Sequence, residues 1–345
     1  MKTVIGRKRA LAAVLTVVIA VGMLTGCGDS KGKSSDRIRI GVTAYDQYDT
    51  FIKGYMGCFK DDIETDDGVT ADIYFAAQNQ QKQNEQVKKM IEDGCSVICV
   101  NLVDRTAPSE IIDMARKSDI PVIFFNRELV KEDLYRWDKM YYVGADAFKS
   151  GIMEGEIAAT ACMTDKSIDR NGDGKIQYVV LEGEVGHQDA LVRTEYSVNT
   201  MTEKGLVLDK KGYAVANWNR AQAQTKMKSM IESMGNEIEV VLANNDDMAL
   251  GAIDEYKAEG ILRSDWPAFF GIDGTDDGLD AVKSDEMVGT VYNDKEGQAK
   301  AMYNLCIALA KGQSTDDLDM IDGKYIRLPY QKVTAANINT FSSRR

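Results

Sequence analysis

Short apolar runs alternate with segments of helical period along most of the chain. From Arg37 onward, strand-like runs such as IRIGVTAY, SVICVNLV and PVIFFNRE are separated by amphipathic segments such as NEQVKKMIEDG. In that segment Val87, Met90 and Ile91 fall on one helical face. Strands that are apolar on both faces and separated by helices indicate parallel sheets covered on both sides. Because the units resume after YYVGAD and are too many for one small sheet, the pattern predicts an α/β fold of two lobes.

Polar side chains follow many of these apolar runs. In open α/β sheets, ligands bind beyond the carboxyl ends of the strands. The positions to inspect are therefore Tyr45 to Phe51, Asn101, Asn126, Glu184 to Arg193, Asn245, Asp273 and Asn293. Each of them alone is equally well explained as the cap of the following helix. Together they predict a polar pocket, because buried amides and carboxylates cost free energy unless they are hydrogen-bonded.

The first 27 residues are a different kind of sequence. Four basic residues precede the apolar run LAAVLTVVIAVGMLTG, which is the order of a secretory signal peptide and is short for a membrane span of ~20 residues. LTGC, residues 24–27, resembles the lipobox of bacterial lipoprotein signals and predicts that Cys27 is the lipidated first residue of the mature protein. The alternative is a plain N-terminal anchor. Residues 28–36 then form a flexible tether, which predicts an extracytoplasmic protein anchored to the cell membrane.

Charge and absent motifs exclude several functions. The net charge of −12, from 42 basic and 54 acidic residues, argues against nucleic acid as a partner. The sequence has no dinucleotide-binding glycine motif, no P-loop, and no G-x-S-x-G elbow between a predicted strand and a predicted helix. Its single histidine, His187, makes an H-E-x-x-H metalloprotease motif impossible. Apart from Cys27, five irregularly spaced cysteines form no disulfide framework, and we expect them to be small buried apolar residues.

The segment DRNGDGKIQ, residues 169–177, reads as the first nine positions of a twelve-residue calcium loop. Asp169, Asn171 and Asp173 occupy positions one, three and five, and Gly174 occupies the sharp turn at position six. The twelfth position, where a bidentate Glu is expected, is Val180. The alternative is a glycine-containing turn that holds no metal.

The segments GEVGHQDALVRT and VVLANNDDMALGA resemble those of the galactose/glucose-binding proteins, substrate-binding components of bacterial sugar uptake and chemotaxis. The similarity continues in order through IGVTAYDQYDTF, CVNLVD, PVIFFNRE, YYVGAD, DRNGDGKIQ, FFGID and GTVYNDKEGQAKA, over residues 37–312. It implies the type I periplasmic-binding-protein fold, with two doubly wound parallel-sheet lobes joined by a three-crossing hinge. The implied lobes are residues 37–146 plus 294–328 and residues 147–293 plus 329–345.

The resemblance also implies a sugar site. Its members are Asp49, Phe51, Asn101, His187, Asp189, Arg193, Trp218, Asn245, Asp273 and Asn293. Phe51 and Trp218 would cover the two faces of a pyranose ring, while carboxylates, amides and a planar guanidinium satisfy its hydroxyls. Two departures bear on specificity: AYDQYDT replaces the usual residues around Asp49, and Gln188 stands where a proline is usual.

The same resemblance completes the metal site. It implies that a carboxylate from a separate strand, Glu239 in IEVVLANND, replaces the missing Glu of the loop. Structural Ca²⁺ would then be held by Asp169, Asn171, Asp173, Gln177 and Glu239 side chains and the Lys175 carbonyl, a number of oxygens that suits this ion.

The implied function is not enzymatic. We expect a monomeric, lipid-anchored protein that binds an aldohexose of the galactose or glucose type and delivers it to an ABC permease by hinge closure. Two alternatives stay open. The protein could present bound sugar to a chemoreceptor or sensor-kinase ectodomain, or it could be a glycoside hydrolase that uses Asp49 and Asp189.

Overall fold

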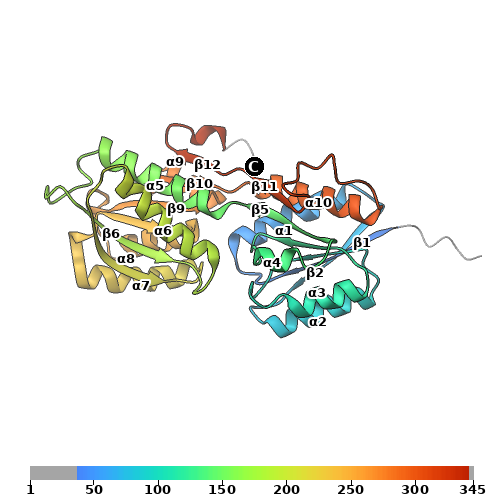
Figure 1. Cartoon of the computed structure of the whole chain (residues 1–345). Coiled ribbons are helices and arrows are strands. Elements are labelled where there is room, and N and C mark those ends of the chain that lie inside the picture. The colour runs from blue at the N-terminus through green and yellow to red at the C-terminus, as the bar shows by residue number, and fades with distance from the viewer. Residues whose placement is uncertain (1–36, 342–345) are drawn as a thin grey trace, which may run out of the picture. The chain divides into compact units, whose positions relative to one another are not determined.

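The computed structural model describes residues 37–341. Within them the chain forms two six-stranded sheets, each covered by helices on both faces (Figure 1). The prediction of two α/β lobes is therefore confirmed. The signal sequence, Cys27 and the tether at residues 28–36 lie outside the described residues.

The first sheet has the strand order β11-β5-β4-β3-β1-β2, and all of its neighbouring strands are parallel. Its strands are β1 (Ile38–Ala44), β2 (Val69–Phe75), β3 (Val97–Val100), β4 (Val122–Phe125), β5 (Met140–Ala145) and β11 (Tyr325–Leu328). The central strands β3 and β4 are buried along their whole length. This burial explains why their sequences are continuously apolar.

Helices cover both faces of this sheet. They are α1 (Thr50–Glu64), α2 (Gln80–Glu92), α3 (Ser109–Lys117), the short α4 (Lys131–Leu134) and α10 (Lys295–Ala310). On one face, Tyr55 of α1 and Met302 of α10 share a core with the strands. On the other face, Met90 of α2 and Ile112 of α3 form a separate core. The first lobe therefore has two apolar layers with the sheet between them.

The second sheet has the strand order β12-β10-β9-β8-β6-β7. Its strands are β6 (Ile176–Glu182), β7 (Leu208–Val215), β8 (Val240–Ala243), β9 (Ala268–Asp273), β10 (Gly289–Tyr292) and β12 (Gln331–Thr334). The edge strand β12 pairs antiparallel with β10, and the other pairs are parallel.

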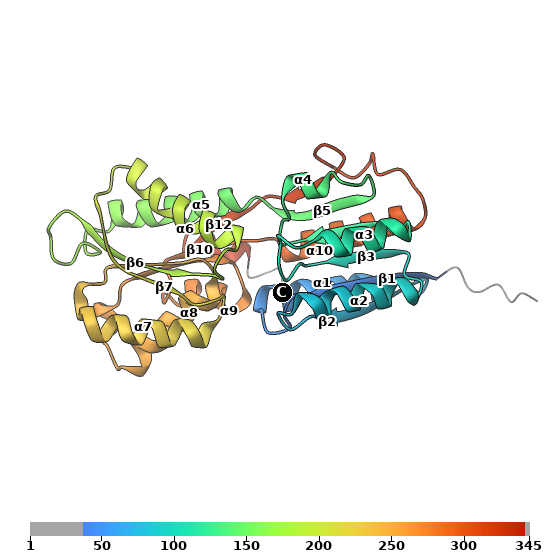
Figure 2. The ribbon, with the colours of Figure 1, turned by 60° about the horizontal axis from the view of Figure 1, so that its bottom comes forward.

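Its helices are α5 (Ala147–Thr164), α6 (Gln188–Glu203), α7 (Arg220–Met234), α8 (Asp246–Ala258) and α9 (Asp276–Lys283), with 3-10 turns at Gly235–Glu237, Arg263–Asp265 and Ile338–Thr340. Figure 2 shows α5 and α6 on one side of the sheet and α7 and α8 on the other. No helix within residues 37–341 is long and apolar enough to cross a membrane.

The chain passes between the two sheets three times: from β5 to α5, from β10 to α10 and from β11 to β12. The last passage contains only Pro329 and Tyr330 between the two strands. These passages bring the loops that follow the strands of both sheets toward a common site, which is described next.

Candidate functional site

A small cavity of about 30 Å³ lies between residues of both lobes. It is lined by Tyr45, Asp49, Phe51, Asn126, Arg127, His187, Asp189, Arg193, Trp218, Asn245 and Asp273. Eight of the ten sugar-site residues implied by the sequence are in this set. The volume holds a few water molecules. Two larger hollows border the cavity, of about 220 Å³ and 340 Å³.

A larger hollow of about 790 Å³ lies elsewhere on the second lobe, beside α5 and the loop before β9. Its lining combines scattered charged and apolar side chains, such as Glu156, Lys332 and Trp266. Glu156 and Lys332 pair with each other at 2.6 Å. The smaller cavity is the better candidate because buried charged groups converge on it from several strand ends.

Three cavity residues are also helix caps. Asp49 caps α1 by accepting from the Ile52 amide at 2.8 Å, and Asn245 caps α8 by accepting from the Met248 amide at 3.0 Å. His187 caps α6 through Nδ1, which accepts from the Asp189 amide at 3.1 Å. Capping and facing the cavity are thus compatible, because each cap uses only one polar atom of its side chain. The cap fixes the side chain in place before any ligand arrives.

Arg193 is the most extensively held cation of the site. Its Nε donates to Ser150 Oγ at 3.2 Å and its Nη1 donates to the Asn244 carbonyl at 2.9 Å. Nη2 donates to Tyr330 Oη at 3.3 Å and to Asp189 Oδ2 at 3.5 Å. Burial alone would lower the pKa of Arg193, but Tyr330 and the nearby carboxylates raise it, so the guanidinium stays charged.

Burial and charge shift the pKa of the two carboxyls beside Arg193 in opposite directions. Asp189 and Asp273 lie 3.5 Å and 3.7 Å from its guanidinium nitrogens. Burial raises the pKa of both carboxyls, and the charge of Arg193 opposes this rise. The site therefore offers a dense set of donors and acceptors in a dry environment.

His187 is neutral in this setting. Burial lowers its pKa well below the ordinary value, and the charges of Arg127, Arg193 and Arg105 lower it further. Because Nδ1 accepts a hydrogen bond, the ring proton is on Nε2. The Asp189 carboxylate lies 3.9 Å from Nδ1 and would form an ion pair only with a protonated ring. His187 thus offers one N–H donor.

Trp218 is placed by an unusual backbone. Its φ is +61°, and the cavity residues Asn126 and Asp273 also have positive φ values, of 58° and 116°. Such conformations cost energy in non-glycine residues and cluster at functional sites. A Cβ on Gly183 would lie 2.2 Å from the Trp218 ring, so only glycine fits there. The His187 ring meets Trp218 edge-on, with centroids 5.2 Å apart.

Two implied sugar residues do not line the cavity. Asn101 is fully buried, accepts from the Tyr45 amide at 3.3 Å and donates to the Phe125 carbonyl and to Asn126 Oδ1. Asn293 is also buried and accepts from Gln298 Nε2 at 2.6 Å. In this structure both residues support the loops around the cavity.

Three cavity residues are absent from the implied sugar site. Tyr45 and Asn126 are among the polar residues at strand ends, a signal that points to a pocket without saying which members face it. Nothing in the sequence pointed to Arg127 as a cavity residue except its position two residues after the end of strand β4. Its guanidinium carbon lies 3.5 Å from the centroid of the Tyr45 ring, a contact within the first lobe that no sequence spacing reveals.

The loop at residues 169–177 has the hydrogen bonding of a tight turn. Asp169 Oδ2 accepts from the Gly174 amide at 3.0 Å, and Asp173 Oδ1 accepts from the Lys175 amide at 2.8 Å. Glu239 accepts from the amides of Arg170 and Gln177 at 2.7 Å and 3.0 Å, so a remote residue, directly before β8, closes this loop.

Two oxygens of the loop lack a hydrogen-bond partner. Asp169 Oδ1 and Gln177 Oε1 are buried and have no hydrogen-bond partner. Such orphaned acceptors are costly unless something else satisfies them. Among residues 37–341, no group of three or more His, Cys, Asp or Glu side chains could hold a metal ion. The donor set fits Ca²⁺ only if amide and carbonyl oxygens contribute, which this hard cation accepts.

The chain is similar to proteins of known description over most of its length. Residues 40–314 match the model of a family described as periplasmic binding protein domain. The D-galactose/methyl-galactoside binding periplasmic protein MglB of Haemophilus influenzae is 34% identical over 337 residues, which cover 96% of this chain and 98% of that protein. A putative rhizopine-binding protein of Rhizobium meliloti is 31% identical, over 87% of this chain and 90% of that protein.

A solved structure gives the same picture of the fold. The ABC transporter solute binding protein from Bacillus halodurans C-125, with bound myo-inositol, has a TM-score of 0.77 at 26% identity. The match covers 91% of this chain and 100% of that one. The ligands in these three descriptions differ: galactose or methyl-galactoside, rhizopine and myo-inositol.

Proposed function

Because this chain belongs to the periplasmic binding protein domain family, we propose that it binds an aldohexose of the galactose or glucose type between its lobes. It is a sugar-binding protein of the kind that serves ABC importers, and it is not an enzyme. This sets aside the glycoside hydrolase that the sequence left open.

The polar lining of the 30 Å³ cavity carries the proposal for a hexose. Carboxylates, two guanidiniums, two amides and a neutral imidazole face it, and Phe51 and Trp218 supply aromatic surface. Ring hydroxyls both donate and accept, so such a set can satisfy them in pairs. A sugar that lacks one hydroxyl would leave a buried protein group unpaired, which is how this kind of site discriminates.

Binding requires movement, because a pyranose needs several times the cavity volume. The lobes, joined by three chain passages, would separate to admit the sugar and close on it. The closed form is then favoured by the ligand's differential affinity for it. We propose that this closed form is what the permease recognises.

A thermal-shift screen of monosaccharides and polyols tests the proposal. A ligand that binds only the folded protein raises its melting temperature by mass action. A free ligand concentration of one hundred times Kd adds ~2.7 kcal/mol to the free energy of unfolding. We expect glucose or galactose to give the largest shift, followed by calorimetric confirmation. A larger shift with ribose or myo-inositol, or none with any hexose, would contradict the assignment.

Replacement of Trp218 tests the stacking role. Trp218→Ala removes an aromatic wall of the cavity, and we expect hexose binding to weaken about fivefold or more, since stacking on an aromatic ring is typically worth ~1 kcal/mol or more. Trp137→Ala, in a half-buried tryptophan that does not line the cavity, is the matched control. Equal affinities of the two variants in calorimetry would rule the role out.

We also propose that the loop at residues 169–177 binds structural Ca²⁺. Asp169, Asn171, Asp173, Gln177 and Glu239 would supply side-chain oxygens and Lys175 its carbonyl. The ion would add cohesion between the loop and the strand after it, with no catalytic role. The support is the pair of orphaned oxygens on Asp169 and Gln177.

Asp169→Asn is the variant that tests this site. We expect it to abolish the rise in melting temperature that Ca²⁺ gives the wild type and to leave the melting temperature in chelator almost unchanged. Glu239→Gln is less informative, because Glu239 also accepts from three loop amides without any metal. Asp165→Asn, an exposed change just before the loop, is the control. A wild type that melts identically with Ca²⁺ and chelator would refute the site.

We further propose that lipid on Cys27 anchors the mature protein, on the evidence of LTGC at residues 24–27. Membrane fractionation of a Cys27→Ser variant checks this, and a variant that stays with the membrane would count against lipidation.

A further inference from the structure

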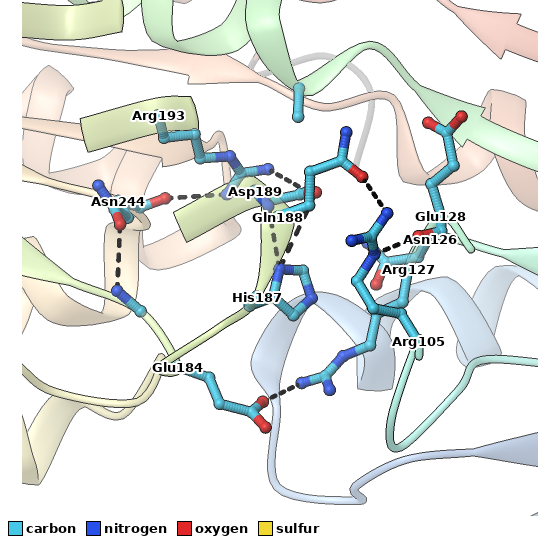
Figure 3. A network of polar contacts seen from close by, with 12 residues as sticks. Arg105, Asn126, Arg127, Glu128, Glu184, His187, Gln188, Asp189, Arg193 and Asn244 are labelled. Carbon is cyan, nitrogen blue, oxygen red and sulfur yellow. Dashed lines mark hydrogen bonds and ion pairs between the residues drawn. The ribbon is translucent and has the colours of Figure 1, made fainter. Parts of the chain in front are cut away.

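Two arginines of the first lobe reach the turn that precedes α6 in the second lobe. Arg127 Nη2 donates to Glu184 Oε2 at 2.6 Å, and Arg105 Nη2 donates to Gln188 Oε1 at 2.7 Å (Figure 3). We call Arg105, Arg127, Glu184 and Gln188 the arginine clasp. A further polar contact between the lobes, Thr50 to Asp247, is exposed at the surface.

The first-lobe side of the clasp is fixed before it reaches across. Strand β4 ends at Phe125, and the next residue, Asn126, has φ of 58°. The turn directs Arg127 back over the Tyr45 ring, where its Nη1 donates to the Val103 carbonyl at 2.9 Å. Arg105 is held by its Nε, which donates to the Glu128 carbonyl at 2.7 Å. Little side-chain entropy is then lost when each arginine makes its contact.

The second-lobe side is a tight turn. The His187 amide donates to the Glu184 carbonyl at 3.1 Å, and Gly186 has φ of 79°. This is the pattern of a type II turn with glycine at its third position. Gln188 is the first residue of α6. The turn therefore holds Glu184, which binds an arginine, at a set distance from His187, which lines the cavity.

The clasp lies between the cavity and its surroundings. Arg127 and His187 line both the 30 Å³ cavity and the 340 Å³ hollow, while Glu184 lines both outer hollows and not the cavity. A sugar that enters the cavity from these hollows must pass the pair of Arg127 and Glu184. The contact therefore has to open for exchange and re-form on closure.

Burial determines how much the ion pair between Arg127 and Glu184 contributes to the stability of the closed form. The Arg127 side chain is 4% exposed and the Glu184 side chain is 41% exposed. Fully exposed pairs contribute little. Here one partner is desolvated, and loss of the carboxylate would leave a buried guanidinium with one partner fewer. The exposed half of the pair makes the contact sensitive to salt.

We propose that the arginine clasp is a latch between the lobes that sets the affinity for the bound sugar and makes that affinity dependent on ionic strength. The proposal rests on the sugar-binding function argued above. Glu184 and Gln188 would thus influence sugar affinity without touching the sugar, because they stabilise the closed arrangement of the lobes. Gln188, where a proline is usual in the resembling family, is then the acceptor for a second arginine.

The test compares the wild type with the double variant Glu184→Gln/Gln188→Ala. The first change removes a charge and keeps an acceptor oxygen, and the second removes the partner of Arg105. Glu203→Gln, at the exposed last residue of α6, removes the same charge away from the clasp and is the control. We expect the double variant to bind its sugar about tenfold more weakly at low salt, as loss of charge-assisted hydrogen bonds implies, and the control to match the wild type.

Two further readouts separate the latch from a general loss of binding. Raising sodium chloride to about 0.5 M should weaken sugar binding by the wild type and hardly change that of the double variant. Small-angle scattering without sugar should give a larger radius of gyration for the double variant. The same affinity, salt response and scattering in both proteins would overturn the proposal. If the wild type binds no sugar, the proposed function fails, while scattering still decides whether the clasp holds the lobes.

Discussion

Glu154, on α5, is fully buried, and neither of its carboxylate oxygens has a hydrogen-bond partner. Burial raises its pKa from 4.5 to about 8, against the opposing charge of Arg193. A buried carboxyl in this state is protonated at neutral pH. Asp246, which is also buried, has a pKa raised to about 7 for the same first reason, although Thr290 and Thr275 donate to it.

The raised pKa of Glu154 predicts a pH dependence of stability. The unfolded carboxyl ionises near pH 4.5 and the folded one near 8, so the contribution to the free energy of unfolding is full below 4.5 and falls as pH rises to 8. Methionine has a side chain of similar length and no titrating group, so Glu154→Met removes this pH-dependent loss of stability. We expect it to stabilise by on the order of 4–5 kcal/mol more at pH 8.5 than at pH 4.

Urea unfolding of both proteins across that pH range is the measurement. The stability of the variant should still decline between about pH 4 and pH 7, and less steeply than that of the wild type, because Asp246 remains. A stability difference between variant and wild type that does not change with pH would show that Glu154 is ionised in the folded protein.

The sequence predicted which polar residues lie at the strand ends better than it predicted what each of them does there. Asp49, His187 and Asn245 are both helix caps and cavity residues, so the two interpretations weighed for strand-end residues hold together. Asn101 has the same position after a strand as these residues, yet its side chain turns to the backbone around Asn126. Position along the chain does not specify that choice, because it depends on which acceptors the neighbouring strand leaves unpaired.

Helices α5 and α6 pack unusually closely through glycines of α5. A Cβ on Gly151 would lie 3.0 Å from the Arg193 Cα, and one on Gly155 would lie 2.4 Å from the Ser197 carbonyl oxygen. Ser150, next to Gly151, accepts a hydrogen bond from Arg193 Nε. The separation of the two helices therefore sets where the guanidinium of the site lies.

Gly155→Ala should push α5 and α6 apart. Because the added methyl meets backbone and cannot be accommodated by a side-chain rotation, we expect a loss of about 2 kcal/mol in the free energy of unfolding, together with weaker sugar binding. Gly57→Ala, at an exposed position of α1 with no atom near the new Cβ, is the control and should stabilise by ~0.5–1 kcal/mol. Chemical denaturation measures both changes. A Gly155→Ala protein as stable as the Gly57→Ala protein would refute the close packing.

The central strands of the sheets were predictable from their apolar runs, and most of the edge strands were not. The strands predicted from IRIGVTAY, SVICVNLV and PVIFFNRE correspond to β1, β3 and β4. The edge strand β7, LDKKGYAV, is half-exposed and polar, and β11 and β12 are four residues each. Such strands carry a weak pattern because pairing on one side, more than burial, holds them in place.

At the scale of the whole molecule, periodicity alone indicated two lobes, and the sheets confirm them. The interleaving of chain segments between lobes came from the family resemblance. Local pattern cannot supply it, because a strand sequence does not state which sheet it will join. The bounds of the lobes by residue number stay a prediction.

The late strands have a consequence for biosynthesis. The first sheet is completed by β11 and one of its faces by α10, both synthesised after all of the second lobe except β12 and the 3-10 turn that follows it. A growing chain therefore cannot finish its first lobe and then add the second, as chains with sequential domains do. Both lobes reach completion within the last fifty or so residues. Such long-range closure slows folding. The newly made chain therefore stays accessible to any factor that handles unfolded polypeptides until β11 and β12 have been made.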